Sequence, residues 1–409
     1  MNKSIFNKTT KSTKNIKSLN INFGPNHPAA HGVLRMVLKL NGEIIEDIDT
    51  HIGLLHRGTE KLMEQKPYIH SIPYFDRLDY VSMLIQEHSY CLAMEKLMKK
   101  EKFFQSFNMV RTMYDEMTRI LNHLMAIGSH TFDIGAMAPI FWGFEERENI
   151  MEFYERVCGA RMHAAFYRPN RMNLAGFSKK LMTDIIMFTL NTYTTFNEIH
   201  TLVTFNKIWK HRMIGIGILT KDMARNNGLT GVLLRSTGEC NDIRLNLGET
   251  YSNYYYINFN SYIGYNGDTY DRYLIRMNEM IESLNIVSYV ANYIIDTHVN
   301  DFNEFYKFYD RRWKKNPYKS MEAMIQHFKY WSEGIKLESS IIYSPVESPK
   351  GEFGVLLFSD NSNKPYRCKI RSPAYYNIQI LSKMVKGHML ADLVSLIGTV
   401  DIVFGEIDR

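Results

Sequence analysis

Apolar and polar residues alternate most regularly between residues 33 and 50. Every second residue from Leu34 to Leu40 is apolar, which places these side chains on one face of a β-strand. Asn41-Gly42 follows, and then a second run of mixed polarity at 43–48. Asn-Gly between two strands is typical of a type I′ turn, which requires a positive φ at both central residues. We therefore predict a β-hairpin that packs on a larger element, because a single hairpin is only marginally stable in water.

The spacing of apolar residues becomes helical between about residues 78 and 210. In 111–130 the apolar side chains recur three and four positions apart, so they share one helix face. A neighbouring polar stripe consists of Glu116, Arg119, His123 and His130. The simpler interpretation of this stripe is a solvated or subunit-facing flank, and a functional site is the alternative.

Three further stretches, 145–165, 179–210 and 268–300, also have the polarity pattern of long helices. Charged residues in the first of them are spaced for pairing four positions apart on a helix. Together with the helix at 111–130, they predict a central helical bundle.

Strand character returns at 341–371, where the runs 355–358 and 366–370 flank a polar turn. One last helix is predicted over 375–397. The ending at 401–409 is largely apolar, and we expect it to be buried because free ends normally fray.

The predicted elements give an α+β fold in four consecutive parts. These are a basic flexible arm (1–20), an N-terminal β region with a histidine-rich corner (21–75), a helical core (76–335), and a C-terminal part with a β region, a helix and a buried tail (336–409).

The charge of the chain is concentrated at its beginning. The 409 residues carry a formal net charge of +6. Five lysines and no acidic residue lie in residues 1–18, which leaves +1 for the rest of the chain. A basic excess confined to a tail does not make a nucleic-acid-binding domain. The basic and aromatic residues 311–315 are accordingly expected to form an exposed docking loop.

The cysteines and glycines exclude several classes of site. The four cysteines lie far apart without a C-x-x-C pair, which argues against a zinc site or an iron–sulfur cluster built from this chain. Gly215-x-Gly217 lacks the remaining residues of a dinucleotide fingerprint, and no phosphate-binding P-loop is present. No uninterrupted apolar run reaches the roughly 18 residues of a membrane span.

Residues 24–35, with the sequence G-P-N-H-P-A-A-H-G-V-L-R, are the clearest candidate for a constrained site. Glycine allows a positive φ and proline fixes φ, so this corner should be rigid and able to present His27 and His31 at fixed positions. Pro28 lies between the two histidines and opposes the helix on which a His-x3-His zinc site would form. A structural corner and a functional site both remain open at this point.

Further polar residues that could carry chemistry are concentrated in the first third of the chain. A tyrosine donates a hydrogen bond from an apolar ring, a histidine titrates near neutrality, and a carboxylate beside the histidine fixes its tautomer. Such a set suits a two-electron, two-proton reduction of a carbonyl-bearing cofactor; a buried polar network is the alternative. The candidates are His27, His31, His51, His56, Arg57, Glu60, Asp76, Arg77, Asp79, Tyr80, His123 and Asp133.

Seven long motifs resemble the hydrogenase-like catalytic-arm subunit of respiratory complex I, the NADH dehydrogenase subunit 7 family. The resemblance runs in order from about residue 20 to 409 and leaves out only the basic arm. The motifs are G-P-N-H-P-A-A-H-G-V-L-R (24–35), H-I-G-L-L-H-R-G-T-E-K (51–61), P-Y-F-D-R-L-D-Y-V-S-M (73–83), E-R-V-C-G-A-R-M-H (155–163), S-M-E-A-M-I-Q-H-F (320–328), E-S-P-K-G-E-F-G (347–354) and D-I-V-F-G-E-I-D-R (401–409).

The resemblance implies a fold derived from the large subunit of [NiFe]-hydrogenases, with the metal site lost because the ancestral cysteine pairs are missing. It also implies that the vacated space holds the ubiquinone headgroup, against a neighbouring subunit that carries the terminal [4Fe–4S] cluster. His31 and Tyr80 match the headgroup-binding residues, and Asp133 matches the aspartate paired with the histidine. Arg57 matches an arginine near the cluster. His27, Arg77 and His123 match supporting positions.

The same resemblance implies the partners and the location of the chain. They are the other complex I subunits, especially the terminal-cluster subunit and the membrane subunit with the quinone channel, on the matrix side of the mitochondrial inner membrane. Mitochondrial encoding is expected, and no nucleic acid partner is expected.

The sequence departs from the family pattern at Arg168-Pro169-Asn170-Arg171 and at Gly248-Glu249-Thr250. Both departures lie away from the proposed pocket and affect the expected conformation of local loops. Two rival functions follow from the resemblance itself. An active hydrogenase would need the missing cysteine pairs, and a purely scaffolding subunit would not need His31, Tyr80 and Asp133 together.

Overall fold

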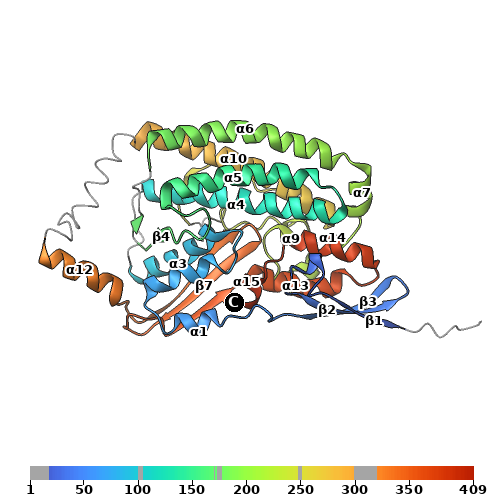
Figure 1. Cartoon of the computed structure of the whole chain (residues 1–409), viewed down its shortest axis with the longest axis horizontal. Coiled ribbons are helices and arrows are strands. Elements are labelled where there is room, and N and C mark those ends of the chain that lie inside the picture. The colour runs from blue at the N-terminus through green and yellow to red at the C-terminus, as the bar shows by residue number, and fades with distance from the viewer. Residues whose placement is uncertain (1–17, 100–104, 170, 173–176, 247–250, 299–319) are drawn as a thin grey trace, which may run out of the picture.

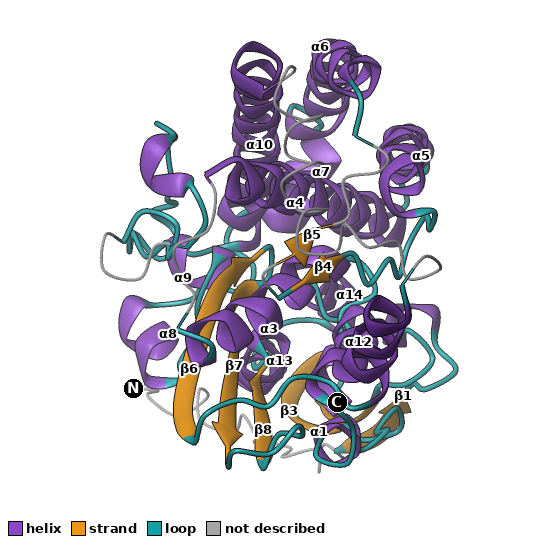
Figure 2. Ribbon diagram, turned by 90° about the vertical axis from the view of Figure 1, so that its left-hand side faces the viewer, coloured by secondary structure: helices purple, strands orange, loops and turns teal. Residues whose placement is uncertain are grey.

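The computed structural model describes residues 18–99, 105–169, 171–172, 177–246, 251–298 and 320–409. Long helices run along the upper part of the molecule and strands lie beneath them (Figure 1). Figure 2 shows the helices end on above the three-stranded sheet formed by the C-terminal strands. This arrangement confirms the α+β class. The predicted docking loop at 311–315 lies outside the described residues.

Four long helices form the upper layer, which confirms the predicted bundle. They are α4 (Gln105–Ile134), α5 (Ala138–Cys158), α6 (Lys179–Thr204) and α10 (Thr269–His298). Helix α4 packs against both α5 and α10, and α10 also packs against α6. The second helix ends at Cys158 rather than 165 because Gly159 adopts a left-handed conformation (φ 78°), which is a common helix stop.

The polar stripe of α4 corrects our interpretation of it as a flank. Glu116, Arg119 and His123 have no exposed surface, and His130 is 2% exposed. The reason is that α4 is surrounded, since α3 (Met83–Leu97), α5, α10 and α14 (Leu390–Val400) all pack against it. A stripe of charge on such a helix must face internal partners of opposite charge.

The N-terminal sheet has the antiparallel order β1 (Leu19–Phe23), β2 (Arg35–Asn41), β3 (Ile44–His51). The alternating side chains from Leu34 to Leu40 are at most 2% exposed, so the predicted hairpin is confirmed. Strand β1 was missed, because its first two residues had been assigned to the flexible arm.

The turn of this hairpin differs from the prediction by one residue. The loop consists of Gly42 and Glu43, and of these two Gly42 has the positive φ (68°). Ile45 and Ile48 are both buried although they lie three positions apart. Opposite Lys39, an irregularity in the pairing inserts one extra residue, which returns both isoleucines to the buried face and shifts the turn.

The C-terminal sheet has the antiparallel order β6 (Ser340–Ser348), β7 (Gly351–Ser359), β8 (Arg367–Arg371). This result confirms the predicted strands at 355–358 and 366–370 and the polar turn between them. The tight connection between β6 and β7 brings Lys350 into the interior, where 3% of its surface is exposed.

The prediction of one helix over 375–397 is wrong, because two helices occupy this region. Helix α13 spans Pro373–Met384 and α14 begins at Leu390. The chain between them turns at Gly387 (φ 86°) and exchanges backbone hydrogen bonds with Ile45 of β3 at 2.9 and 3.0 Å. The final helix α15 (Phe404–Asp408) is buried, as expected for the apolar ending.

The remaining elements are short connections between these layers. They are α1 (Thr59–Met63), α2 (Ile72–Asp76), β4 (Tyr167–Arg168), β5 (Arg171–Met172), α7 (Lys207–Met213), α8 (Lys221–Asn226), α9 (Val232–Arg235), α12 (Met321–Ser332) and three single-turn helices at Pro28–Ala30, Tyr68–Ser71 and Tyr254–Tyr256. None of the described helices is long and apolar enough to cross a membrane.

Two glycines of the histidine-rich corner provide a test of its packing. Both have left-handed backbones, with φ 82° at Gly24 and 79° at Gly32. A Cβ at Gly24 would lie 2.0 Å from the carbonyl oxygen of Leu34, whereas one at Gly32 meets nothing within 4 Å. We expect Gly32→Ala to cost about 1 kcal/mol from its backbone alone. Gly24→Ala should cost at least about 2 kcal/mol more, because the close approach is lost.

Chemical denaturation of the purified chain measures both free energies of unfolding. Equal losses for the two variants would show that the corner is not tightly packed at Gly24.

Candidate functional site

The histidine-rich corner holds its two histidines in different ways. His27 precedes the single-turn helix Pro28–Ala30, and its Nδ1 accepts a hydrogen bond from the Ala29 N–H at 3.2 Å. Its ring also lies against Phe23, with 4.1 Å between ring centroids. His31 ends the turn in a left-handed conformation (φ 51°), and its side chain is exposed. His27 therefore supports the corner, and His31 is presented by it.

Asp133, near the end of α4, is close to both histidines although it is distant from them in sequence. Burial raises the pKa of its carboxyl, and the charges of His31 and His27 act in the opposite direction. A carboxylate beside an exposed imidazole can orient the ring. The structure thus brings together three of the predicted residues at one end of the bundle.

Tyr80 lies in the loop between α2 and α3 and is 38% exposed. Burial, followed by the charge of Asp79, raises the pKa of its phenol, while Lys350 and Arg57 oppose this shift. The neighbouring Asp79 is fully buried and accepts hydrogen bonds from the Val81 N–H at 3.1 Å and the Ser82 hydroxyl at 2.5 Å. These bonds fix the loop, and the raised pKa keeps the Tyr80 hydroxyl protonated and able to donate at neutral pH.

Helix α15 is the common neighbour of the His31 corner and the Tyr80 loop. The ring of Phe404 lies 6.2 Å from that of His31. The next residue, Gly405, lies against the loop, since a Cβ there would be 2.5 Å from the carbonyl oxygen of Leu78. The His31 corner and the Tyr80 loop therefore both lie against the first turn of α15.

The two predicted arginines stabilise the backbone of the Tyr80 loop and the C-terminus. Arg57 donates from its guanidinium to the Arg77 carbonyl at 2.7 Å, and its N–H donates to the Arg409 carbonyl at 3.2 Å. Arg77 donates from its guanidinium to the Pro73 carbonyl at 2.8 Å. Both side chains are otherwise exposed at this edge.

His123, the seventh predicted residue, does not face the exposed part of the site. It is fully buried, and its Nε2 lies 2.8 Å from the Glu279 carboxylate. Burial lowers the pKa of its ring, against the effect of Glu279. It belongs to the internal charge network described below.

Comparison with known proteins identifies the family of the chain. Residues 133–409 match the family model described as respiratory-chain NADH dehydrogenase, 49 Kd subunit. The chain belongs to this family. It is 60% identical over 402 residues to the NADH-ubiquinone oxidoreductase 49 kDa subunit of Paramecium tetraurelia, covering 96% of this chain and all of that protein. It is also 51% identical over 396 residues to the protein of the same name from Cafeteria roenbergensis, covering 96% of this chain and 97% of that protein.

Among the described residues, no three His, Cys, Asp or Glu residues are grouped so that they could hold a metal ion. Cys91 and Cys368 are buried as free thiols, and burial raises the pKa of each.

A hollow of about 410 Å³ lies beside the last three residues of the chain. None of the seven predicted site residues lines it. Its lining residues are Ile52, Gly53, His56, Gly58, Glu60, Lys61, Arg367, Tyr375, Ile407, Asp408 and Arg409.

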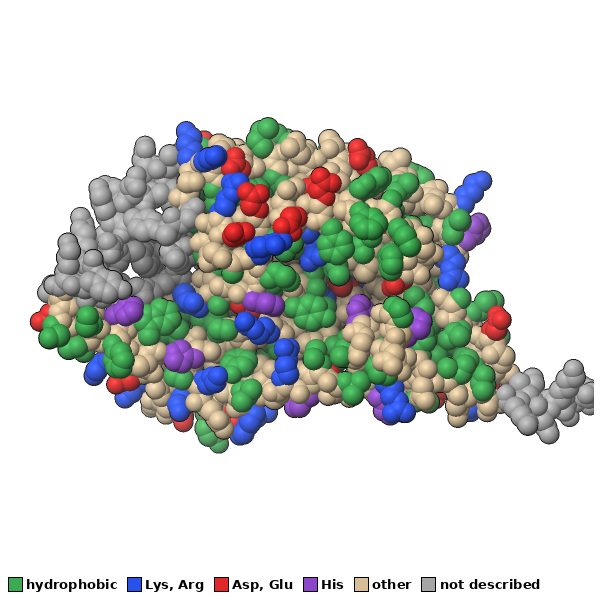
Figure 3. Space-filling view, viewed as in Figure 1, with side chains coloured by type: hydrophobic (Ala, Val, Ile, Leu, Met, Phe, Trp, Pro, Cys, Tyr) green, Lys and Arg blue, Asp and Glu red, His purple; other side chains and the backbone are tan. Residues whose placement is uncertain are grey.

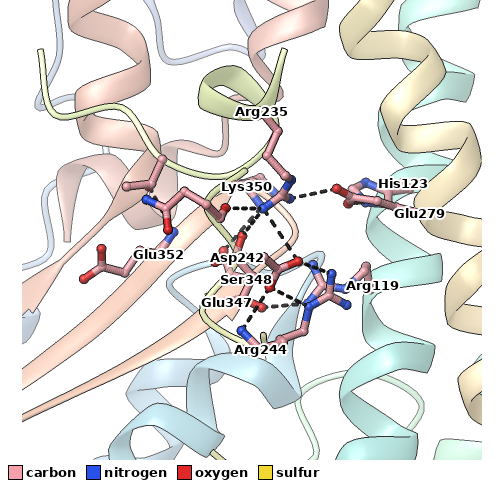
Figure 4. Close-up of polar contacts among 12 residues, drawn as sticks. Arg119, His123, Arg235, Asp242, Arg244, Glu279, Glu347, Ser348, Lys350 and Glu352 are labelled. Atoms are coloured by element: carbon pink, nitrogen blue, oxygen red, sulfur yellow. Dashed lines mark hydrogen bonds and ion pairs between the residues drawn. The ribbon is translucent and has the colours of Figure 1, made fainter. Parts of the chain in front are cut away.

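A buried charge network between α4, α10 and the sheet was not predicted from the sequence (Figure 4). Arg235 of α9 lies at its centre and donates to Glu279 at 2.7 Å and Glu347 at 2.8 Å. Arg244 joins Asp242 at 2.7 Å to Glu116 at 3.1 Å. The polar stripe on α4 was the sequence feature that pointed to this network. The residues that pair with the stripe lie on other segments of the chain, and the periodicity of α4 does not identify them.

Lys350 forms a second buried cluster that reaches the Tyr80 loop. Its ammonium group lies 2.8 Å from the Asp79 carboxylate and 3.7 Å from that of Asp401, and it donates to the amide oxygen of Asn122. Burial opposes the charged form, but Asp401 and Asp79 raise the pKa of Lys350, so the ammonium stays charged. The lysine therefore connects the Tyr80 loop to α4 and to Asp401 at the end of α14.

Removing this charge tests the role of the cluster. Lys350→Met leaves Asp79 and Asp401 buried without their cation, and we expect a loss of about 3–5 kcal/mol in the free energy of unfolding. Lys369→Met, at an exposed position of β8, is the control and should change stability by less than about 0.5 kcal/mol. Thermal denaturation of both variants measures the difference, and a fully stable Lys350→Met chain would contradict the assigned role.

Proposed function

We propose that this chain is a core subunit of the peripheral arm of respiratory complex I and lines the pocket for the ubiquinone headgroup. The observation that supports the proposal is that the His31 corner and the loop that contains Tyr80 both lie against the first turn of α15, and that Asp133 lies near the corner. These segments are far apart in the sequence. The relatives are named as subunits of NADH-ubiquinone oxidoreductase, which agrees with this interpretation.

The chemistry of the site residues suits a quinone. Tyr80 stays protonated and donates a hydrogen bond to one carbonyl oxygen, and His31 donates to the other. Asp133 lies close enough for its charge to act on His31 and orients the ring toward the substrate, and His31 can hand a proton to the substrate as the quinone is reduced. The electrons would come from the terminal [4Fe–4S] cluster that the neighbouring subunit is proposed to hold.

An apolar surface next to Asp133 supports an apolar ligand or partner at this end of the bundle. Phe132, Met137, Phe141 and Phe144 are 41–67% exposed at the junction of α4 and α5. Figure 3 shows hydrophobic side chains gathered at the right-hand end of the bundle. Exposed apolar patches of this kind mark binding or docking surfaces. They fit a quinone and the subunits proposed to enclose it, namely the cluster-bearing subunit and the membrane subunit with the quinone channel.

The finer parts of this proposal follow from the family resemblance. The fold is derived from the large subunit of [NiFe]-hydrogenases, and the subunit lies on the matrix side of the mitochondrial inner membrane and is mitochondrially encoded. Arg57 and Arg77 support the loop near the cluster-bearing neighbour. His123 acts through Glu279 rather than by touching the quinone.

Tyr80→Phe tests the hydrogen bond to the quinone. The variant keeps the ring and removes the donor, so kcat/KM for ubiquinone in the assembled complex should fall about tenfold. NADH oxidation by an artificial acceptor that takes electrons before the quinone should be unchanged. Tyr265→Phe, at an 82% exposed tyrosine, is the matched control. Unchanged ubiquinone kinetics in Tyr80→Phe would favour a scaffolding role instead.

Asp133→Asn tests the pairing with His31. Without the carboxylate the charge that acts on His31 is lost and the ring is no longer oriented, so we expect slower ubiquinone reduction, weaker proton translocation, or both. Asp49→Asn removes the carboxylate from another exposed aspartate–histidine pair, in which Asp49 lies 3.3 Å from His51 Nε2, and it should leave both activities unchanged. Full retention of both activities in Asp133→Asn would refute the coupling role.

A further inference from the structure

Two carboxyl groups, those of Asp76 and Glu87, lie together in the interior, and both residues have no exposed surface. Asp76 is the last residue of α2, and Glu87 lies in the first turns of α3. Residues 77–82, which include Tyr80, connect the two helices. Asp76 therefore lies at the start of the Tyr80 loop, and Glu87 lies in the helix that follows its end.

One oxygen of each carboxyl accepts a backbone hydrogen bond from the same neighbouring segment. Asp76 Oδ2 accepts from the Ala165 N–H at 2.8 Å, and Glu87 Oε2 accepts from the Tyr167 N–H at 2.8 Å. The other two oxygens, Asp76 Oδ1 and Glu87 Oε1, receive no donor from the described residues. Each carboxyl acts on the pKa of the other, so the two groups lie close together, and two adjacent carboxyls can share a hydrogen bond only if one of them carries a proton.

The charges around the pair do not neutralise it. His163 and Arg77 act on Asp76, and Arg168 acts on Glu87. None of these cations lies within ion-pair distance of either carboxyl, and the nearby Cys91, Cys158 and Tyr154 are groups whose own pKa values are raised by burial. Burial and the neighbouring Asp76 raise the pKa of Glu87 well above its usual value. Two buried carboxylates in contact would repel each other strongly.

We propose that Asp76 and Glu87 form a proton-binding site, in which one shared proton, carried by Glu87, joins the start of the Tyr80 loop to the helix that follows its end. The ligand is a single proton. When it is bound, Glu87 donates to Asp76 Oδ1, and both carboxyls hold the backbone at Ala165 and Tyr167. When it is lost, the start of the loop and this helix are pushed apart and this backbone is released. The proposal does not depend on what Tyr80 binds.

The linkage between the proton and stability gives the first test. Because the pKa of Glu87 is raised in the folded chain, the stabilisation is fully present below the usual carboxyl pKa and decreases as pH rises towards the folded value. One proton corresponds to as much as about a tenfold loss of protection per pH unit in that window. Amide hydrogen exchange of the assembled complex, corrected for intrinsic rates, measures this loss in peptides that cover Ala165 and Tyr167. Protection that is independent of pH in the wild type would overturn the proposal without any variant.

Amide substitutions give the second test. In Glu87→Gln the carboxamide supplies a permanent donor to Asp76 and still accepts from Tyr167, so protection should remain and its pH dependence should disappear. Asp76→Asn should behave alike, with the donor on the other side. In the double variant one donor is left without an acceptor, so protection should fall at least about tenfold below the product of the single effects.

Glu146→Gln is the matched control. Glu146 is a buried carboxylate whose two oxygens accept from the hydroxyls of Thr192 and Thr195, both at 2.8 Å. The Glu146→Gln variant should leave amide exchange at Ala165 and Tyr167 unchanged at every pH. If Glu87→Gln and Asp76→Asn instead each increased protection and the two gains multiplied in the double variant, both carboxyls would be ionised and no proton would be shared.

Discussion

The structure depends on the pairing of charges that are removed from water. Helix α4 is enclosed by other elements along most of its length, yet it carries Glu116, Arg119 and His123 on one side. Each would be costly to bury alone, because an isolated charge loses its hydration and gains no partner. The cost is offset by Arg235 and Arg244, which reach the bundle from the segments between α8 and α10. The upper layer and the sheet can therefore pack closely only in the register that matches these charges.

This constraint explains how exposed groups of the site are held in place. His31 and Tyr80 are both partly or fully exposed, and neither is fixed by packing of its own ring against a core. Their positions come from buried neighbours: Asp79 and Lys350 beneath the tyrosine, and Phe404 beside the histidine. Lys350, in the β6–β7 turn, pairs with Asp79 of the Tyr80 loop and with Asp401 at the end of α14, so these three segments share one cation. A displacement of any one of the three segments would therefore displace the other two.

Much of the fold follows from the local sequence pattern. The parts that this pattern failed to predict have a physical reason in common. The alternation from Leu34 to Leu40 and the helical spacing at 111–130 predicted elements that are present, because each element buries one face. The helix predicted over 375–397 failed because the break at Gly387 is stabilised by backbone bonds to Ile45, a residue far away in sequence. The prediction of the turn after β2 was wrong by one residue because Ile45 and Ile48 are both buried. Periodicity along the sequence does not predict local structure that tertiary contacts determine.

The candidate site could likewise be predicted only in part from the sequence. His31, Tyr80 and Asp133 were assigned from motifs, and their common surroundings at α15 are a property of the folded chain that no spacing reveals. The sequence predicted Asp76 only as a member of a polar motif, and it did not predict Glu87, because an acidic residue in a helix is common. The folded structure distinguishes both residues, since one oxygen of each accepts from a backbone N–H and the other has no donor among the described residues. In this interior the unpaired atoms are informative, because many other buried charges of the described residues have a partner of opposite sign, such as Arg111 with Glu95 and Lys350 with Asp79. A carboxyl whose neighbour is another carboxyl can satisfy the same rule only by taking up a proton.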